Sequence, residues 1–187
     1  PCPPLPLTIE TIRPICRYLE GGLRVGNHVI DGSGRPWLFA SLPDAPSGVL
    51  WHRMDAGWET IDLGAALEGL NTQGGRATSL TRDDRGRIHL AVATNPDKQE
   101  TTWYDPSLEL FYLTLDEAGR RLAFEQVTGS DASVAEWLPA LEQWDWTRAD
   151  GCTGNGPWMA YTRGLNAGGI WGDNRNALST EVHLQRL

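Results

Sequence analysis

Two residues near the carboxyl-terminal end, Tyr161 and Arg163, have types and spacing suited to acid chemistry on a carboxylate-bearing substrate. One residue separates them in a β-prone run, so on a strand both side chains point to the same face. A guanidinium beside a phenol can lower the pKa of the phenol, and it can pair bidentately with a carboxylate. The pair could therefore donate a proton and neutralise a substrate charge. A hydrogen-bonded tyrosine beside a bridging arginine, on an ordinary amphipathic strand, would explain the same pattern without catalysis.

The four histidines supply the candidates for a general base. His28 follows Asn27 at the end of a predicted inner strand, where the two residues would border a central channel and could meet substrate. A strand histidine bonded to a neighbouring loop is the alternative for His28. His89 is a substrate-binding candidate; it stands where a repeated segment elsewhere has tryptophan, so packing is its alternative role. His52 and His183 fall on predicted third strands and are expected at the surface or between sheets.

Aromatic residues in predicted loops give a separate signal for sugar binding. Trp103, Trp144 and Trp171 fall in loops or at strand ends, and flat aromatic faces stack on sugar rings. Packing between sheets is the alternative role for each of them. Arg82 is a further substrate-binding candidate, weaker than Arg163 but of the same chemistry. We therefore predict a sugar-contacting surface built from loop tryptophans and guanidinium groups.

A segment that recurs three times would position these residues. Each copy has an acidic, glycine-containing turn, then an aromatic residue or histidine, then a β-prone run. The turns begin at Asp31, Asp83 and Asp150, and the aromatic or histidine positions are Trp37, His89 and Trp158. Repeats of about 40–50 residues with four short strands, lengthened by insertions, are typical of β-propeller blades. Core packing between sheets is the expected role of Trp37, Trp58 and Trp158.

The turn and strand signals predict an all-β chain of about three four-stranded antiparallel blades. The blades are expected at about residues 21–63, 76–128 and 140–187, after an extended segment, 1–20, that could supply a closing strand. Propellers have four to eight blades, so three do not close a ring. We therefore expect a partial propeller that another chain or a missing segment completes. A dimer of half-rings and a stack of β-meanders that is not a propeller are the alternatives.

Three segments within this plan are predicted in more detail. Ala65–Leu70 is expected to form a helical fragment, and Ser133–Gln143 a short helix or a loop. The third blade is expected to begin with a strand at Gln143–Arg148 and to lack its outer strand. An unpaired edge of this kind exposes a row of backbone donors and acceptors.

Composition limits the compartment and the partners. The formal net charge of −8 disfavours nucleic acid and anionic membranes as general partners. No apolar run is long enough to span a membrane. The chain begins at Pro1 without a methionine, which is typical of a processed product or an excised piece. We expect a secreted or periplasmic protein.

The cysteines and acidic turns leave two questions open. Three cysteines allow one internal disulfide, with Cys16 to Cys152 the preferred pair, or three reduced thiols. No zinc pattern is present. The turns at Asp83-Asp84 and at Asp173 could contribute oxygen ligands to Ca²⁺, although turn capping is the expected use. No cofactor is expected to be required.

Several segments resemble the BNR-type β-propellers of polysaccharide-degrading enzymes. The segments that carry the resemblance are 25–42 (VGNHVIDGSGRPWLFASL), 49–63 (VLWHRMDAGWETIDL), 78–92 (TSLTRDDRGRIHLAV) and 156–187, which opens with GPWMAYTRG. The last is similar to the closing blade of lyases that cleave uronic-acid polysaccharides such as ulvan. Together these segments cover most of residues 25–187.

The resemblance implies cleavage of an acidic polysaccharide by β-elimination. Such a lyase needs a base for the C5 proton, a cation for the adjacent carboxylate and an acid for the leaving oxygen. We assign these roles to His28, Arg163 and Tyr161 respectively. A lectin-like propeller without catalysis, a glycoside hydrolase and a protein-interaction scaffold are the alternatives.

Overall fold

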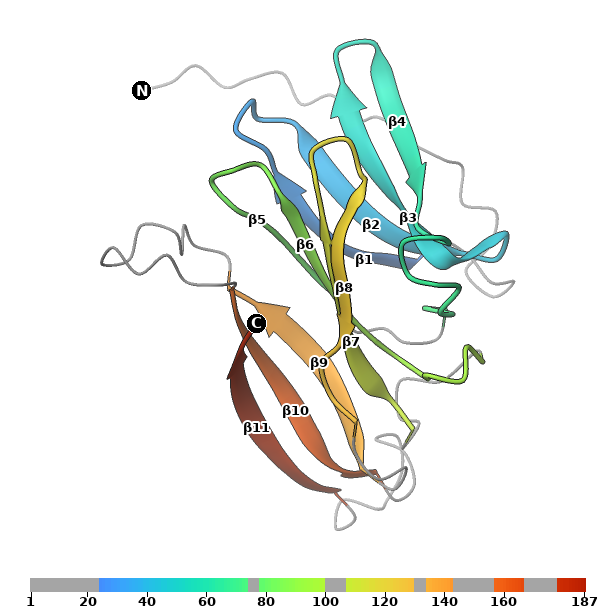
Figure 1. Cartoon of the computed structure of the whole chain (residues 1–187), viewed down its shortest axis with the longest axis vertical. Coiled ribbons are helices and arrows are strands. Elements are labelled where there is room, and N and C mark those ends of the chain that lie inside the picture. Colours follow the sequence, from blue (N-terminus) through green and yellow to red (C-terminus); the bar gives the residue numbers. More distant parts are fainter. Residues whose placement is uncertain (1–23, 74–77, 100–106, 130–133, 143–156, 167–177) are drawn as a thin grey trace.

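The computed structural model describes residues 24–73, 78–99, 107–129, 134–142, 157–166 and 178–187. Within them the chain is all-β and forms three antiparallel sheets (Figure 1). Sheet A contains β1 (Arg24–Ile30), β2 (Pro36–Leu42), β3 (Ala45–Met54) and β4 (Gly57–Asp62). Sheet B contains β5 (Thr78–Arg82), β6 (Ile88–Thr94), β7 (Glu109–Leu115) and β8 (Arg121–Gln126). Sheet C contains β9 (Ala135–Leu141), β10 (Trp158–Asn166) and β11 (Leu178–Arg186).

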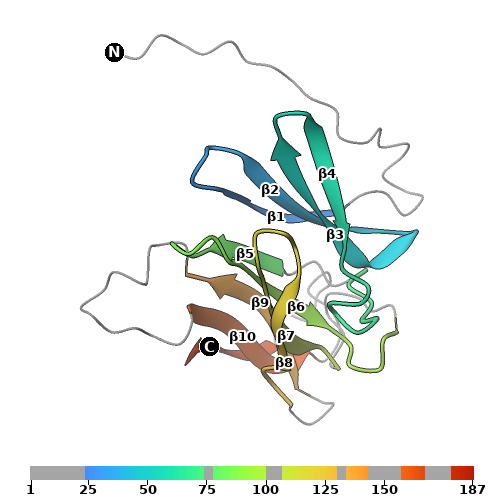
Figure 2. The same cartoon turned by 45° about the horizontal axis from the view of Figure 1, so that its top comes forward.

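Each sheet is a meander in which strands that are consecutive in the chain pair with one another. The first strands of the sheets lie next to each other, β1 beside β5 and β5 beside β9. Sheet B lies between sheets A and C in both views (Figures 1 and 2). The predicted all-β class with antiparallel sheets is confirmed. Sheet C has three strands among the described residues.

The main core lies between sheets A and B. Trp37, Phe39 and Leu50 project from sheet A and pack with Leu90 and Leu113 of sheet B. These residues alternate along their strands, as expected for side chains that share one face. Trp37 is almost completely buried, which confirms its predicted packing role. Burial of large apolar side chains on this scale is the dominant favourable term holding the two sheets together.

A second core joins sheets B and C. Ala91 and Tyr112 of sheet B pack with Leu141, Met159 and Tyr161 of sheet C. Alternate residues of sheet C therefore point away from sheet B. This alternation divides sheet C into an inner face, which meets sheet B, and an outer face.

The helix predicted at Ala65–Leu70 is wrong, because this segment consists of consecutive turns. Leu63, Leu67 and Leu70 are all buried in the core between sheets A and B, and their i, i+4, i+7 spacing imitates a helical stripe. The helical path is broken at Glu68 and Gly69, whose φ angles are 54° and 77°. Left-handed residues of this kind cannot continue a right-handed helix.

The expectation of a helix or loop at Ser133–Gln143 is also wrong, because β9 occupies most of it. The strand contains Pro139, although proline cannot donate to a ladder. In the structure it lies on an edge strand, where proline is tolerated. Leu138, with φ of 50°, and Pro139 fall at a register shift opposite β10. The strand predicted at Gln143–Arg148 lies outside the described residues.

The other two tryptophans of the predicted core differ from Trp37. Trp58 is half-buried against the face of sheet A that points away from sheet B. Trp158 is 42% exposed, so its predicted core role is wrong. It lies on the outer face of sheet C, because its neighbour Met159 faces sheet B.

Candidate functional site

The inner face of sheet C gathers five polar or titratable side chains, which we call the sheet C cluster. Strand register places Tyr161 opposite His183, and Arg163 opposite both Glu181 and Glu136. Paired residues on neighbouring strands share a face, so three strands contribute to one surface. The predicted same-face placement of Tyr161 and Arg163 thereby extends to a set of five.

Tyr161 is the least accessible aromatic member of this cluster. Tyr161 is 8% exposed, and its ring stacks on the ring of His183 with 5.4 Å between the two centroids. Burial raises the pKa of the phenol, Glu136 adds to this rise, and Arg163 only partly opposes it. Arg163 acts in the expected direction, but the expected net lowering of the Tyr161 pKa is wrong. The phenol stays protonated at neutral pH and can act as a proton donor.

Arg163 is held by a buried carboxylate. Its Nε lies 3.0 Å from Oε1 of Glu136, whose side chain is 2% exposed, whereas the guanidinium side chain is 45% exposed. The backbone N–H of Glu136 donates to the carbonyl of Leu108, which fixes β9 against sheet B. A buried carboxylate generally needs a cationic partner of this kind. Arg163 is thus both a structural partner and an accessible cation.

His183 completes the accessible part of the cluster. Its Nε2 lies 3.3 Å from Oε2 of Glu181, and both side chains reach solvent. Sequence reasoning set His183 aside as a surface residue and missed Glu136 and Glu181. The signal available was the Glu-x-His spacing on β11, which gives two polar side chains on one strand face. Only the register with β10 brings them to Tyr161.

The structure does not bring His28 to this cluster. His28 pairs with Leu38, and Asn27 with Phe39, on β1 of sheet A. Sheet B separates that strand from β10 (Figure 1). His28 is exposed, as a general base should be, but the three predicted catalytic residues are distributed over two different sheets.

His89 is a structural residue rather than a substrate contact. Its Nδ1 lies 2.5 Å from the hydroxyl of Tyr112, and its Nε2 lies 3.4 Å from Oδ2 of Asp83. Burial lowers the pKa of His89 to about 4, with the charge of Asp83 acting in the opposite direction. Because the residue is buried, no substrate can reach it. Its predicted packing role is confirmed.

Arg82 joins two sheets at the end where their hairpin turns meet. It donates to Glu117 of the β7–β8 turn at 3.0 Å and lies against Gly32 of the β1–β2 turn. Glu117 in turn covers Gly86 of the β5–β6 turn, where an added Cβ would collide with its carboxylate. These contacts occupy the guanidinium that was expected to bind substrate.

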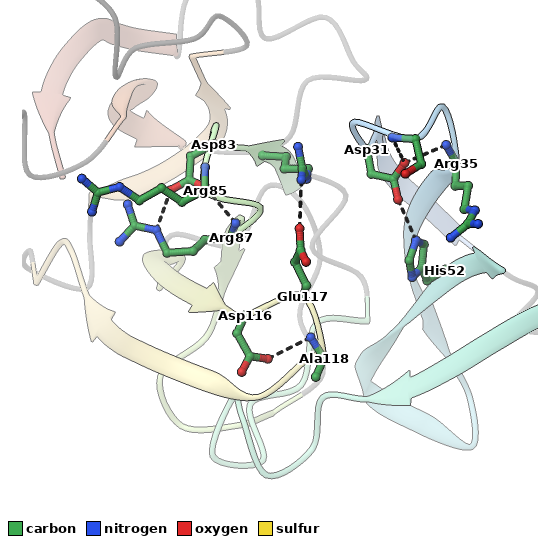
Figure 3. A network of polar contacts seen from close by, with 11 residues as sticks. Asp31, Arg35, His52, Asp83, Arg85, Arg87, Asp116, Glu117 and Ala118 are labelled. Carbon is green, nitrogen blue, oxygen red and sulfur yellow. Dashed lines mark hydrogen bonds and ion pairs between the residues drawn. The ribbon is translucent and has the colours of Figure 1, made fainter.

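Three hairpin turns at this end share the sequence Asp-x-x-Gly-Arg. They run from Asp31 to Arg35, from Asp83 to Arg87 and from Asp116 to Arg120. In each, the first carboxylate accepts the backbone N–H groups two and four residues later, and the glycine has φ between 74° and 82°. Figure 3 shows the bonds of Asp31 and Asp83 and the bond from Ala118 to Asp116. This is a type I turn closed by a glycine bulge.

The second oxygen of each turn aspartate binds a side chain. Oδ2 of Asp31 lies 3.1 Å from Nε2 of His52, whereas Asp83 and Asp116 accept from the arginine that ends their own turn. Burial disfavours ionisation of Asp83, but its hydrogen bonds with Arg87 outweigh this effect and lower the pKa of its carboxyl. The turn at Asp116 escaped sequence reasoning, although it repeats the motif. The predicted turn at Asp150 lies outside the described residues.

Other predicted contacts also fall outside the described part of the chain. They are Trp103, Trp144, Trp171, Asp173 and the three cysteines, Cys2, Cys16 and Cys152. The residues that are described contain no group of three or more His, Cys, Asp or Glu side chains that could hold a metal ion. Asp83 is committed to its turn and to Arg87, in line with the capping role expected for it.

Two comparisons of the sequence with known proteins were negative. No family model matches the chain, and no curated protein matches it either. In the described parts of the chain, no helix has the length and apolar character needed to cross a membrane. The sheet C cluster and the stacking of the three sheets are therefore the observations on which a functional proposal rests.

Proposed function

We propose that this chain is part of a carbohydrate-active β-propeller that cleaves a uronic-acid-containing polysaccharide by β-elimination. Three four- or three-stranded meanders stacked in chain order, with their first strands adjacent, are consistent with propeller blades. In this proposal, blades from another chain or segment close the ring. The compartment is secreted or periplasmic.

The observation that carries the proposal is the convergence of a tyrosine, a histidine and an arginine on one face of sheet C. In the proposed reaction, His183 removes the C5 proton of a uronate, and the electron pair of the broken C–H bond forms the C4–C5 double bond. The C4–O bond breaks, and Tyr161 protonates the departing oxygen. Arg163 neutralises the uronate carboxylate, which must compete with Glu136 for the guanidinium.

His183 replaces His28 as the proposed base because of its position. Its ring contacts that of Tyr161, and Glu181 can orient the imidazole and stabilise its protonated form. Tyr161 remains protonated because burial raises its pKa, which suits a general acid. A protonated phenol beside an accessible imidazole is the arrangement that a general acid and a general base require.

A second candidate function is sugar binding without catalysis. The low exposure of Tyr161 favours it, since a leaving oxygen must approach the phenol directly. Arg163, Glu181 and His183 remain accessible to a bound sugar in either case.

The test is incubation of the protein, in its native assembly, with a panel of uronic-acid polysaccharides. We expect the ultraviolet absorbance of unsaturated uronate products to appear. It should fall by about 10²-fold or more in Tyr161→Phe and in His183→Ala, and stay near wild type in His28→Ala. Loss of the product absorbance in His28→Ala alone would show that the base is His28 of sheet A. Binding without product would favour the second candidate, and neither binding nor product across the panel would refute both.

A further inference from the structure

The outer edge of β11 differs from the other outer edges of the molecule. Sheets A and B end in a fourth strand, β4 or β8, whereas no described strand pairs with the far side of β11. By position in its sheet, β11 corresponds to β3 and β7, the third strands. Those strands are paired on both sides, and every residue of β7 is buried. β11 is therefore the third strand of its sheet, as β3 and β7 are, but one of its two edges has no described neighbour.

The shape of β11, rather than its charge content, leaves it open to pairing. β11 carries two charged residues, Glu181 and Arg186, and the outer strands β4 and β8 also carry two each. Charges, lysines, prolines and bulges are the usual devices against edge-to-edge pairing. β11 has neither lysine nor proline, and it pairs with β10 through nine consecutive residues without a register shift. It is a long, regular edge, about 30 Å in length at the usual rise per residue.

Apolar exposure is concentrated on the same strand. Val182 is 80% exposed and Leu184 is 66% exposed, the two highest values among the exposed large apolar residues of the described chain. Both lie on the outer face of sheet C, because they pair with Thr162 and Ala160 rather than with the residues that meet sheet B. Exposed apolar residues along a free edge are typical of a strand that pairs with another polypeptide.

We propose that a second copy of this chain supplies the missing neighbour, through antiparallel pairing of β11 with β11 about a two-fold axis at Val182. Val182 is the midpoint of Leu178–Arg186, so this register pairs all nine residues of both strands. It places each Glu181 opposite His183 of the second copy, which makes the strand complementary to itself in charge. A two-fold interface requires self-complementarity of this kind. The result is one continuous six-stranded sheet.

The side chain of Val182 lies on the opposite face from the sheet C cluster, so Val182 can be substituted without changing a cluster side chain, although Glu181 and His183 take part in both proposals. The net charge of −8 on each copy opposes association. Salt screens this repulsion while backbone hydrogen bonds and apolar contacts persist. The dimer should therefore become stronger as ionic strength rises, which is the reverse of binding to an oppositely charged partner.

The first test is sedimentation equilibrium of the whole chain over a range of concentrations. We expect a dimer whose dissociation constant rises about tenfold or more in Val182→Lys, since two like charges would face each other at the axis. Leu122→Lys is the matched control, because Leu122 is an exposed apolar residue on β8 with 54% exposure. Circular dichroism establishes that both variants fold. A monomer at every concentration, or a dimer unaffected by Val182→Lys, would overturn the proposal.

The second test identifies the register. Directly opposite residues of an antiparallel pair lie within the Cα separation that a disulfide spans. On oxidation, the Val182→Cys variant should therefore form a disulfide between the substituted positions of the two copies, with the linked peptides identified by mass spectrometry. Leu122→Cys should not cross-link to itself. Failure of lyase activity with cross-linking intact would refute only the proposed function, and the converse result would refute only the dimer.

Discussion

Nε2 of His89 lies 3.4 Å from Oδ2 of Asp83, and both side chains are closed off from solvent. The other nitrogen of the same ring meets the hydroxyl of Tyr112 on the neighbouring strand β7. One imidazole thus ties the β5–β6 turn to the middle of sheet B. Sheet A repeats the relationship with different residues, since Asp31 binds His52 at 3.1 Å. The aspartate of the turn therefore does more than shape the hairpin.

The first prediction is that acid destabilises the protein through His89. Burial lowers the pKa of His89 to about 4, whereas an unfolded histidine titrates near 6.5. Between these values the unfolded chain binds the proton and the folded chain does not, so the free energy of unfolding falls as the pH decreases. The fully developed loss is about 3 kcal/mol. Denaturant titrations at a series of pH values from about 7 down to about 4 measure it.

A His89→Gln variant is the control for this dependence of the free energy of unfolding on pH, which we call the pH slope. It should be less stable at neutral pH but should lose less stability across the same pH range. The lowered carboxyl pKa values of Asp31 and Asp83 stabilise the fold above the ordinary carboxyl range, and this contribution is lost below about pH 4. They therefore do not produce the slope at higher pH. An equal slope in wild type and variant would contradict the assignment to His89.

The second prediction compares two copies of the same turn. Asp83→Ala should reduce the free energy of unfolding by about 3 kcal/mol, because it leaves two backbone N–H groups and Arg87 without their buried acceptor. Asp116→Ala removes the same bonds from an exposed turn, where water can replace them. It should shift the melting temperature only slightly. Calorimetry of the two variants side by side tests the difference, and equal losses would show that burial is not the cause.

The third prediction concerns two glycines with similar backbone conformations. Gly48 has φ of 93° and Gly34 has φ of 79°, so alanine is strained at both sites. A Cβ on Gly48 would lie 2.5 Å from the ring of Phe39, whereas a Cβ on Gly34 would meet nothing within 4 Å. Gly48→Ala should therefore cost about 1–3 kcal/mol more than Gly34→Ala. Chemical denaturation measures both, and similar costs would mean that Phe39 moves aside freely.

Most of the fold was predictable because turns and alternation are local. Of the described strands, all except β9 lie within the predicted blade ranges, 21–63, 76–128 and 140–187. β9 is the exception, because its edge position makes Pro139 harmless, and that position depends on the whole sheet. The turn at Asp116 was equally available, since Asp-x-x-Gly-Arg occurs three times. It lies between the third and fourth strands of its sheet, whereas the turns at Asp31 and Asp83 lie between the first and second strands. A repeat with one such turn per blade therefore does not predict it.

The site was less predictable because it depends on register between distant strands. That Tyr161 and Arg163 share one face of a strand follows from their spacing alone. The contact of Tyr161 with His183 requires in addition the alignment of β10 and β11. The position of Glu136 requires β9 in addition. The pKa of Tyr161 was predicted in the wrong direction because burial, which the sequence does not reveal, outweighs the nearby guanidinium.

The last prediction tests the competition for Arg163. Glu136→Gln keeps the shape of the buried side chain but removes the charge that neutralises the guanidinium. Binding of a uronate oligosaccharide to the sheet C cluster should become about fivefold tighter, the equivalent of about 1 kcal/mol for a strengthened charge-assisted contact. The pKa of Tyr161 should also fall, since Glu136 is one of the groups that raise it.

Calorimetric titration and ultraviolet titration of the phenol measure these two effects. Glu181→Gln is the matched control, because Glu181 is mostly exposed and its side chain pairs with His183 rather than with Arg163. It should leave the phenol titration unchanged. Burial of Tyr161 is the same in both variants, so a fall in its pKa confined to Glu136→Gln can only come from the carboxylate beside Arg163. If binding is unchanged while the pKa falls, Arg163 does not contact the sugar, and the cation of the proposed mechanism must be sought elsewhere.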